Sequence, residues 1–186
     1  MEEDNSLAAY TDALLLQNFL AGDEASFEEL FRRHYDMVYG ALFRLTGTRA
    51  EAEDLAQEVF LKLYRSAPRR ADNVAGWLYR TAINTGYNAL RSGRRRRRRE
   101  AAQPPGPPPL PEDELLRHEA QQQVRRALAR LPKRAASLLI LREMGFSYGE
   151  MAAIAGVAPG SVGTLLARAQ RAFRKAYEEE EDAPAG

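Results

Sequence analysis

The sequence predicts an all-α fold made of two small helical domains joined by a linker rich in arginine and proline. Apolar residues recur with helical spacing along nearly all of the 186 residues, and no stretch alternates as a half-buried strand would. Six consecutive arginines at 94–99 and six prolines among residues 104–111 mark the linker. We therefore expect domains at 1–93 and 113–178, a flexible linker at 94–112 and an acidic tail at 179–186.

Four helices are expected in the first domain, each with local signals at its ends. An apolar stripe runs through each helix, and short polar residues or glycines interrupt the pattern between them. Helix starts are expected at Asp23, at Thr48 with Glu51 as a capping box, and at Asn73. Helix ends are expected at Gly22, Gly47 and Gly93.

The second domain carries the spacing of a helix-turn-helix. Two helices, one from about Glu112 and one after Pro132, precede a second predicted capping box formed by Ser147 and Glu150. Gly156 follows the short helix and can adopt the left-handed conformation that the turn needs. A generic helical hairpin also has a glycine turn and apolar faces, so that alternative stays open.

Charge is distributed in blocks of opposite sign, although the whole chain carries only +1. Residues 65–99 hold eleven Lys and Arg against one Asp, and residues 124–177 hold ten against two acidic residues. The segments before, between and after these blocks are acidic. Two basic blocks favour two contacts with one polyanion, because Lys and Arg that neutralise phosphates release counterions. The alternative is two solvated helical faces and an unstructured arginine run.

Composition argues against several other classes of function. The chain has no cysteine, and its two histidines, His34 and His118, are 84 positions apart, so no metal cluster is expected. No run approaches the ~20 apolar residues that span a bilayer. The acidic N-terminus, Met1 to Asp4, lacks the basic start and the apolar core of a secretion signal. No catalytic motif is present. We expect a cytoplasmic chain that needs no metal or cofactor and is not an enzyme.

The fourth expected helix interleaves aromatic and basic side chains. Aromatic rings beside arginines suit single-stranded nucleic acid, because bases stack on the rings. Trp77 is nevertheless expected in the core, at helical spacing from Val74. Tyr79, Arg80 and Asn84 are the better candidates for exposed contacts.

Three segments carry a family resemblance when they are taken in order. They are Asp54 to Leu63 (DLAQEVFLKL), Gly76 to Asn84 (GWLYRTAIN), and Leu131-Pro132 followed by the helix-turn-helix of residues 147–174. In this order the chain resembles the extracytoplasmic-function (ECF) sigma factors of bacterial RNA polymerase. The resemblance covers about residues 25–177 and implies a member that retains only sigma region 2 and sigma region 4.

The resemblance implies a subunit that binds core RNA polymerase, directs it to specific promoters and helps to open the DNA. The implied partners are the β′ clamp and β subunits, promoter DNA and an anti-sigma factor. Residues matched to polymerase binding are Asp54, Gln57, Glu58 and Leu61. Residues matched to the minus-ten element are Arg69, Arg70, Asn73, Trp77, Tyr79, Arg80, Asn84 and Arg91. Residues matched to the minus-thirty-five element are Ser147, Pro159, Ser161, Thr164, Arg168 and Arg171.

The recognition helix departs from the family pattern. Gly163 and Leu165 stand where many relatives carry Lys and Arg, so long donors that could read base edges are scarce. We therefore expect the second domain to bind duplex DNA mainly through phosphates, with weak base readout from Thr164 and Ser161.

The sequence offers two alternative functions and one regulatory role. A stand-alone helix-turn-helix regulator would bind DNA without polymerase, and the motif at 54–63 argues against it. A small enzyme would need a catalytic constellation that the sequence lacks. The acidic residues 178–182 are expected to form a frayed terminus, with autoinhibitory folding against a basic patch as the alternative.

Overall fold

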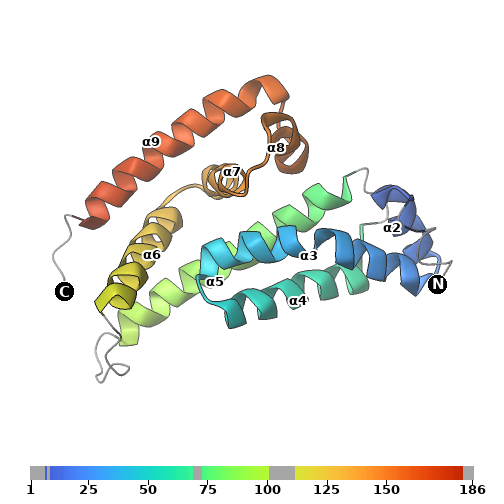
Figure 1. The fold of residues 1–186 in the computed structure, drawn as a ribbon, viewed down its shortest axis with the longest axis horizontal. Helices are drawn as coiled ribbons and strands as arrows, with labels where there is room; N and C mark the ends of the chain where they lie inside the picture. Colours follow the sequence, from blue (N-terminus) through green and yellow to red (C-terminus); the bar gives the residue numbers. More distant parts are fainter. Residues whose placement is uncertain (1–6, 8, 69–72, 101–111, 182–186) are drawn as a thin grey trace.

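The structure is a computed structural model that describes residues 7, 9–68, 73–100 and 112–181, with only the backbone for residues 93–100, 112–118 and 181. Every regular element in this part of the chain is helical, as the sequence predicts (Figure 1). The N-terminal bundle comprises α2 (Asp12–Leu20), α3 (Glu24–Thr46), α4 (Arg49–Ser66) and α5 (Val74–Glu100). The C-terminal bundle comprises α6 (Glu112–Arg130), α7 (Lys133–Glu143), α8 (Tyr148–Ala155), the 3-10 helix η1 (Pro159–Ser161) and α9 (Val162–Glu181).

Helix ends with local signals are confirmed. The Asp23 carboxylate accepts a hydrogen bond from the Ala25 amide at 3.2 Å and caps α3. The Asn73 side-chain oxygen accepts from the Gly76 amide at 2.6 Å and caps α5. Gly47 ends α3 with φ of 75°, in the left-handed region that glycine adopts without strain. These ends depend on neighbours within four residues, which is why sequence alone predicts them.

One predicted capping box and one predicted helix end are wrong. Helix α4 starts after Thr48 as predicted, but the Thr48 side chain makes no capping hydrogen bond, so the predicted capping box is not formed. Gly93 does not end α5, which continues to Glu100, and residues 94–100 of the expected linker are therefore helical. An interior glycine costs only ~1 kcal/mol of helix propensity, and arginine is a good helix former. The proline tract lies outside the described residues.

The acidic end of the chain also differs from the expected frayed terminus. Helix α9 extends to Glu181, and Glu179 and Glu180 pair with two arginines of α6. The Arg126 guanidinium lies 3.0 Å from Glu180, while Arg130 contacts both glutamates. The glutamates thus hold α6 against α9 within the C-terminal bundle.

One apolar core lies inside the N-terminal bundle. It joins side chains of α2, α3, α4 and α5, and its most buried members have almost no solvent exposure. These members include Leu15, Leu30, Leu42, Val59, Leu63 and Leu78. The core fixes α4 and α5 against α3 and leaves one face of α4 turned to solvent.

A second apolar core joins the two bundles. Tyr79, Ile83 and Tyr87 of α5 and Leu45 of α3 are buried in the same cluster as residues from α6, α7, α8 and α9. The two domains expected from the sequence are therefore in contact, with α7 and α8 lying against the N-terminal bundle (Figure 1). The physical reason is that α5 carries two apolar stripes, and each stripe must be covered.

Candidate polymerase and nucleic-acid interfaces

The four residues matched to polymerase binding form one exposed face of α4. Asp54, Gln57, Glu58 and Leu61 follow the helical spacing of three, four and seven, and all four are exposed. Leu61 is 48% exposed, whereas the adjacent Phe60 points into the core. Two carboxylates around an exposed leucine make a surface that fits a basic partner with an apolar strip.

The described residues matched to the minus-ten element lie mostly on one polar face of α5. Asn73, Trp77, Arg80, Asn84 and Arg91 are separated by four, three, four and seven positions, so they share a side of the helix. Trp77 is only partly buried. Arg69 and Arg70 lie outside the described residues. The Arg91 guanidinium lies 5.8 Å from the centre of the Tyr87 ring, within cation–π range.

The polar face of α5 is engaged by the C-terminal bundle. The Asn73 side-chain amide donates to the carbonyl of Ala153, and Arg80 donates to the carbonyl of Ile154 at 3.2 Å. Both acceptors lie in the last turn of α8. On the next turns of α5, the Lys133 ammonium lies 3.4 Å from the Asn84 side-chain oxygen. Three of the matched side chains therefore contact α7 or α8.

Tyr79 is not the exposed contact that the sequence predicts. Its side chain is fully buried, and its hydroxyl donates to the carbonyl of Ser137 in α7 at 2.7 Å. Burial raises the pKa of the Tyr79 phenol well above its ordinary value. Tyr79 belongs to the second apolar stripe of α5, which places it in the core that joins the bundles.

Helices α8 and α9 form the predicted helix-turn-helix. The chain bends by 109° between α8 and the segment that starts at Pro159, within the ~90–120° typical of the motif. Ser147 and Glu150 form the predicted capping box at the start of α8. Gly156 ends α8 with φ of 64°, and its amide donates to the Ala152 carbonyl.

The residues matched to the minus-thirty-five element all reach solvent. Ser147, Pro159, Ser161, Thr164, Arg168 and Arg171 are exposed. In contrast, Leu165 is partly buried against the core that joins the bundles. A Cβ at Gly163 would lie 3.6 Å from the Tyr148 ring, an ordinary contact. The exposed front of α9 therefore offers short side chains near its start and arginines further along.

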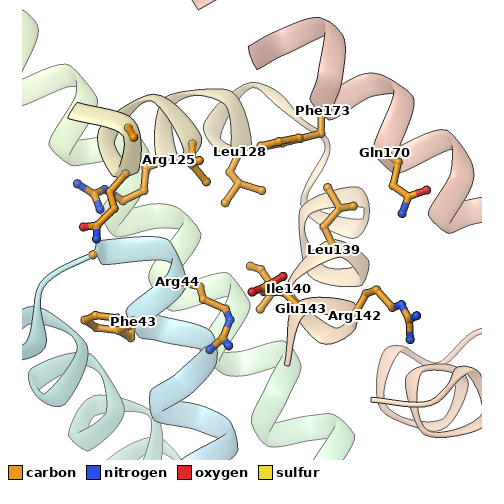
Figure 2. A pocket seen from close by; sticks show the side chains of 14 residues that line it. Phe43, Arg44, Arg125, Leu128, Leu139, Ile140, Arg142, Glu143, Gln170 and Phe173 are labelled. Carbon is orange, nitrogen blue, oxygen red and sulfur yellow. The ribbon is translucent and has the colours of Figure 1, made fainter. Parts of the chain in front are cut away.

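A groove that the sequence did not reveal runs between the bundles (Figure 2). It encloses about 780 Å³ and is lined by side chains from α3, α6, α7 and α9. Its apolar lining includes Phe43, Leu128, Leu139 and Phe173, and Arg44 and Arg142 lie along it (Figure 2). Side chains from four separate helices make this lining, so no local pattern in the sequence could have indicated it.

The described part of the chain holds no group of three or more His, Asp or Glu side chains that could bind a metal ion. No single described helix is long and apolar enough to cross a membrane, and only α8 and α9 taken together across their bend reach that length and composition.

Comparisons with known proteins show which family the chain belongs to. Residues 30–96 match the family described as Sigma-70 region 2, and residues 121–173 match Sigma-70, region 4. The chain is 32% identical to the RNA polymerase sigma-H factor of Pseudomonas aeruginosa, over 90% of this chain and 94% of that one. It is 34% identical to the ECF RNA polymerase sigma factor SigM of Mycobacterium tuberculosis, over 86% and 81%.

The fold is also found in a solved structure, that of CnrH in complex with the cytosolic domain of CnrY. The TM-score is 0.57 at 17% sequence identity, and the match covers 92% of this chain and 99% of that chain. At this identity the similarity concerns the fold alone.

An all-α fold with a helix-turn-helix and a second basic helix is typical of DNA-binding proteins. The similarity of this chain to sigma factors over nearly the whole length decides between the sigma factor and the stand-alone regulator. The chain belongs to the ECF sigma factors, which bind core RNA polymerase, direct it to promoters and help to open the DNA.

Proposed function

We propose that this sigma factor binds core polymerase through the exposed face of α4. The observation that carries the proposal is that Asp54, Gln57, Glu58 and Leu61 are all solvent-exposed while the C-terminal bundle lies elsewhere. An apolar side chain surrounded by carboxylates suits the β′ clamp as an interaction site. Like other sigma factors, the chain contributes binding and DNA opening and no bond chemistry.

The test is a core-binding titration with single substitutions. Leu61→Ala and Asp54→Ala should each weaken binding of purified core polymerase, by about tenfold for a central interface residue. Glu28→Ala is the control, because Glu28 is an exposed acid of the same bundle on α3. Equal affinities of all three variants and the unmodified chain would show that α4 is not the contact.

We also propose that the polar face of α5 captures the opened minus-ten strand. Trp77 and Arg80 would stack on and neutralise a flipped nucleotide, which lets binding energy offset the cost of unstacking. Tyr79 can take part only where the C-terminal bundle leaves α5, since it is buried here. Open-complex formation by holoenzyme should fall with Arg80→Ala, as read by permanganate reactivity of the melted strand.

For the minus-thirty-five element, the proposed contacts are the exposed residues of η1 and α9. Arg168 and Arg171 would bind phosphates, with weak base readout from Thr164 and Ser161. Arg168→Ala should weaken binding to a minus-thirty-five duplex and reduce the slope of log affinity against log salt by about one. Binding unchanged at every salt concentration would refute this assignment.

An anti-sigma factor is the proposed regulatory partner in the cytoplasm. The groove between the bundles supports it, because an apolar lining beside Arg44 and Arg142 fits an acidic amphipathic helix. CnrH, which shares the fold, was solved with the cytosolic domain of CnrY. Exchanging Phe43, which is 41% exposed, for aspartate should weaken inhibition by the cognate partner in a transcription assay.

A further inference from the structure

Tyr148 presents an exposed aromatic ring at the start of the helix-turn-helix. It is the first residue of α8 and is 48% exposed. The capping box of Ser147 and Glu150 fixes the backbone on both sides of it. The ring therefore projects from a well-defined helix start, while a large part of it stays open to solvent.

The ring of Tyr148 lies beside the first turn of α9. A Cβ at Gly163 would lie 3.6 Å from the Cε2 atom of the ring, and Gly163 itself is only partly exposed. In helix-turn-helix proteins, side chains near the start of the recognition helix contact base edges in the major groove. The Tyr148 ring thus lies next to the position from which a side chain of residue 163 would extend.

The neighbours of this ring on the exposed surface are small. A Cβ at Gly149 or at Gly160 would meet no other atom within 4 Å, so neither position is crowded. Ser161 and Thr164 are exposed, but their side chains are short. Among these residues, only Tyr148 has a side chain long enough to reach a base edge from a helix that stands back from the groove.

A cation from a third helix contacts the same ring. The Arg142 guanidinium, in the last turn of α7, lies 5.9 Å from the centre of the Tyr148 ring, within cation–π range. Arg142 is exposed and places a positive charge beside the ring, where DNA phosphates would be attracted. The α8 ring is therefore flanked by an α7 cation and by the α9 backbone.

We propose that Tyr148 reads one base pair of the minus-thirty-five element, in place of the side chain that residue 163 lacks. The edge of its ring contacts the methyl group of a thymine, the apolar group that the major groove exposes. Arg142 positions the ring. The inference rests on the minus-thirty-five role of α9 proposed above and adds a specificity residue from α8 to the weak readout by Thr164 and Ser161.

The first test measures sequence preference with holoenzyme. The probe is a promoter selected by transcription, with its minus-thirty-five element randomised and its minus-ten element kept; bound molecules are sequenced. Tyr148→Ala should lose a preference for thymine on the order of tenfold at one base pair and keep the preferences elsewhere. Tyr148→Phe keeps the ring and should keep the preference. Tyr64→Ala is the control, because Tyr64 is a tyrosine of similar exposure, 47%, on α4.

Two results of this selection would overturn the proposal. A uniform loss of affinity across all sequences in Tyr148→Ala would show contact with phosphate alone. Loss of the thymine preference in Tyr148→Phe as well would show that the hydroxyl, and not the ring, makes the contact. Folding of each variant is checked by its circular dichroism spectrum and by its affinity for core polymerase.

The second test removes the thymine methyl from the DNA. Uracil in place of thymine at the base pair found above should weaken binding of wild-type holoenzyme and leave binding of Tyr148→Ala holoenzyme unchanged. Arg142→Met should reduce the thymine preference at this base pair and at no other, since Arg142 acts through the ring. An equal effect of uracil on wild type and on Tyr148→Ala would refute contact with the methyl group.

Failure of this inference is distinguishable from failure of the minus-thirty-five role of α9. If Arg168→Ala leaves duplex binding unchanged at every salt concentration, α9 does not face the DNA, and readout by Tyr148 fails with it. If Arg168→Ala weakens duplex binding while Tyr148→Ala keeps every base preference, α9 binds the element and only the role of Tyr148 is refuted.

Discussion

Ser147→Ala should destabilise the helix-turn-helix. The Ser147 hydroxyl oxygen accepts from the Glu150 amide at 3.3 Å, and the Glu150 carboxylate accepts from the Ser147 amide at 2.8 Å. Helix α8 has only eight residues, so its first turn depends strongly on this cap. Loss of a serine N-cap costs about 1 kcal/mol. For a chain of this size, that change lowers Tm by about 2–4 °C.

The pH dependence of this effect follows from Glu150. Hydrogen bonds from Ser147 hold the pKa of the Glu150 carboxyl below its ordinary value. A carboxyl whose pKa is lowered by folding stabilises the fold above its unfolded pKa, and this contribution is lost as pH falls through the folded pKa. The difference in Tm between Ser147→Ala and wild type should therefore shrink below about pH 4.

The assay is thermal unfolding by circular dichroism, combined with binding to a minus-thirty-five duplex. Ser147→Asp keeps a cap acceptor and should keep most of the Tm, while its charge would weaken DNA binding if position 147 lies near a phosphate. Ser66→Ala, at an exposed serine that ends α4, is the control. A Tm for Ser147→Ala equal to that of wild type would refute the capping argument.

Three further predictions test other features of the fold. Gly156→Ala should lower the free energy of unfolding by about 1 kcal/mol in urea titrations, since alanine is strained at φ of 64°; unchanged stability would contradict the left-handed turn. Glu179→Gln with Glu180→Gln should increase non-specific duplex affinity at low salt, because the paired α6 arginines become available to phosphate; an unchanged salt slope would count against it. The hydrogen bond with His34, with smaller contributions from Arg33, lowers the pKa of Asp12 although burial opposes it. The Asp12→Asn variant lacks this carboxylate, so its free energy of unfolding should fall less than that of wild type when the pH is lowered below about 4, as measured by acid unfolding. A pH profile of stability identical to that of wild type would refute the contribution of Asp12.

Much of the fold follows from short-range sequence signals. Asp23, Asn73 and Ser147 cap their helices as predicted, because each cap joins residues two or three positions apart. Thr48 shows the limit of such signals, since the capping box it suggests is not formed. Gly93 shows another, because the helix propensity of the arginines that follow it outweighs one interior glycine.

The packing of the two bundles against each other is only weakly indicated by the sequence. Tyr79, Ile83 and Tyr87 recur every four residues on α5, beside the stripe formed by Val74, Leu78 and Ala82. A helix with two apolar stripes needs a packing partner for each stripe, so this pattern indicates that a second group of helices covers α5. The identity of the second neighbour could not be read from it, because the contacts to α7 and α8 join residues about 50 to 80 positions apart.

The core that joins the bundles has a consequence for engineered hybrids. Sigma factors invite construction of chimeras in which the promoter-reading halves of two paralogues are exchanged. Here the donor half would have to match Ile83 and Tyr87, whose burial is completed by the C-terminal bundle. A hybrid joined at the proline tract should therefore expose an apolar strip on α5 and aggregate, unless that strip comes from the same parent protein as the helices that cover it.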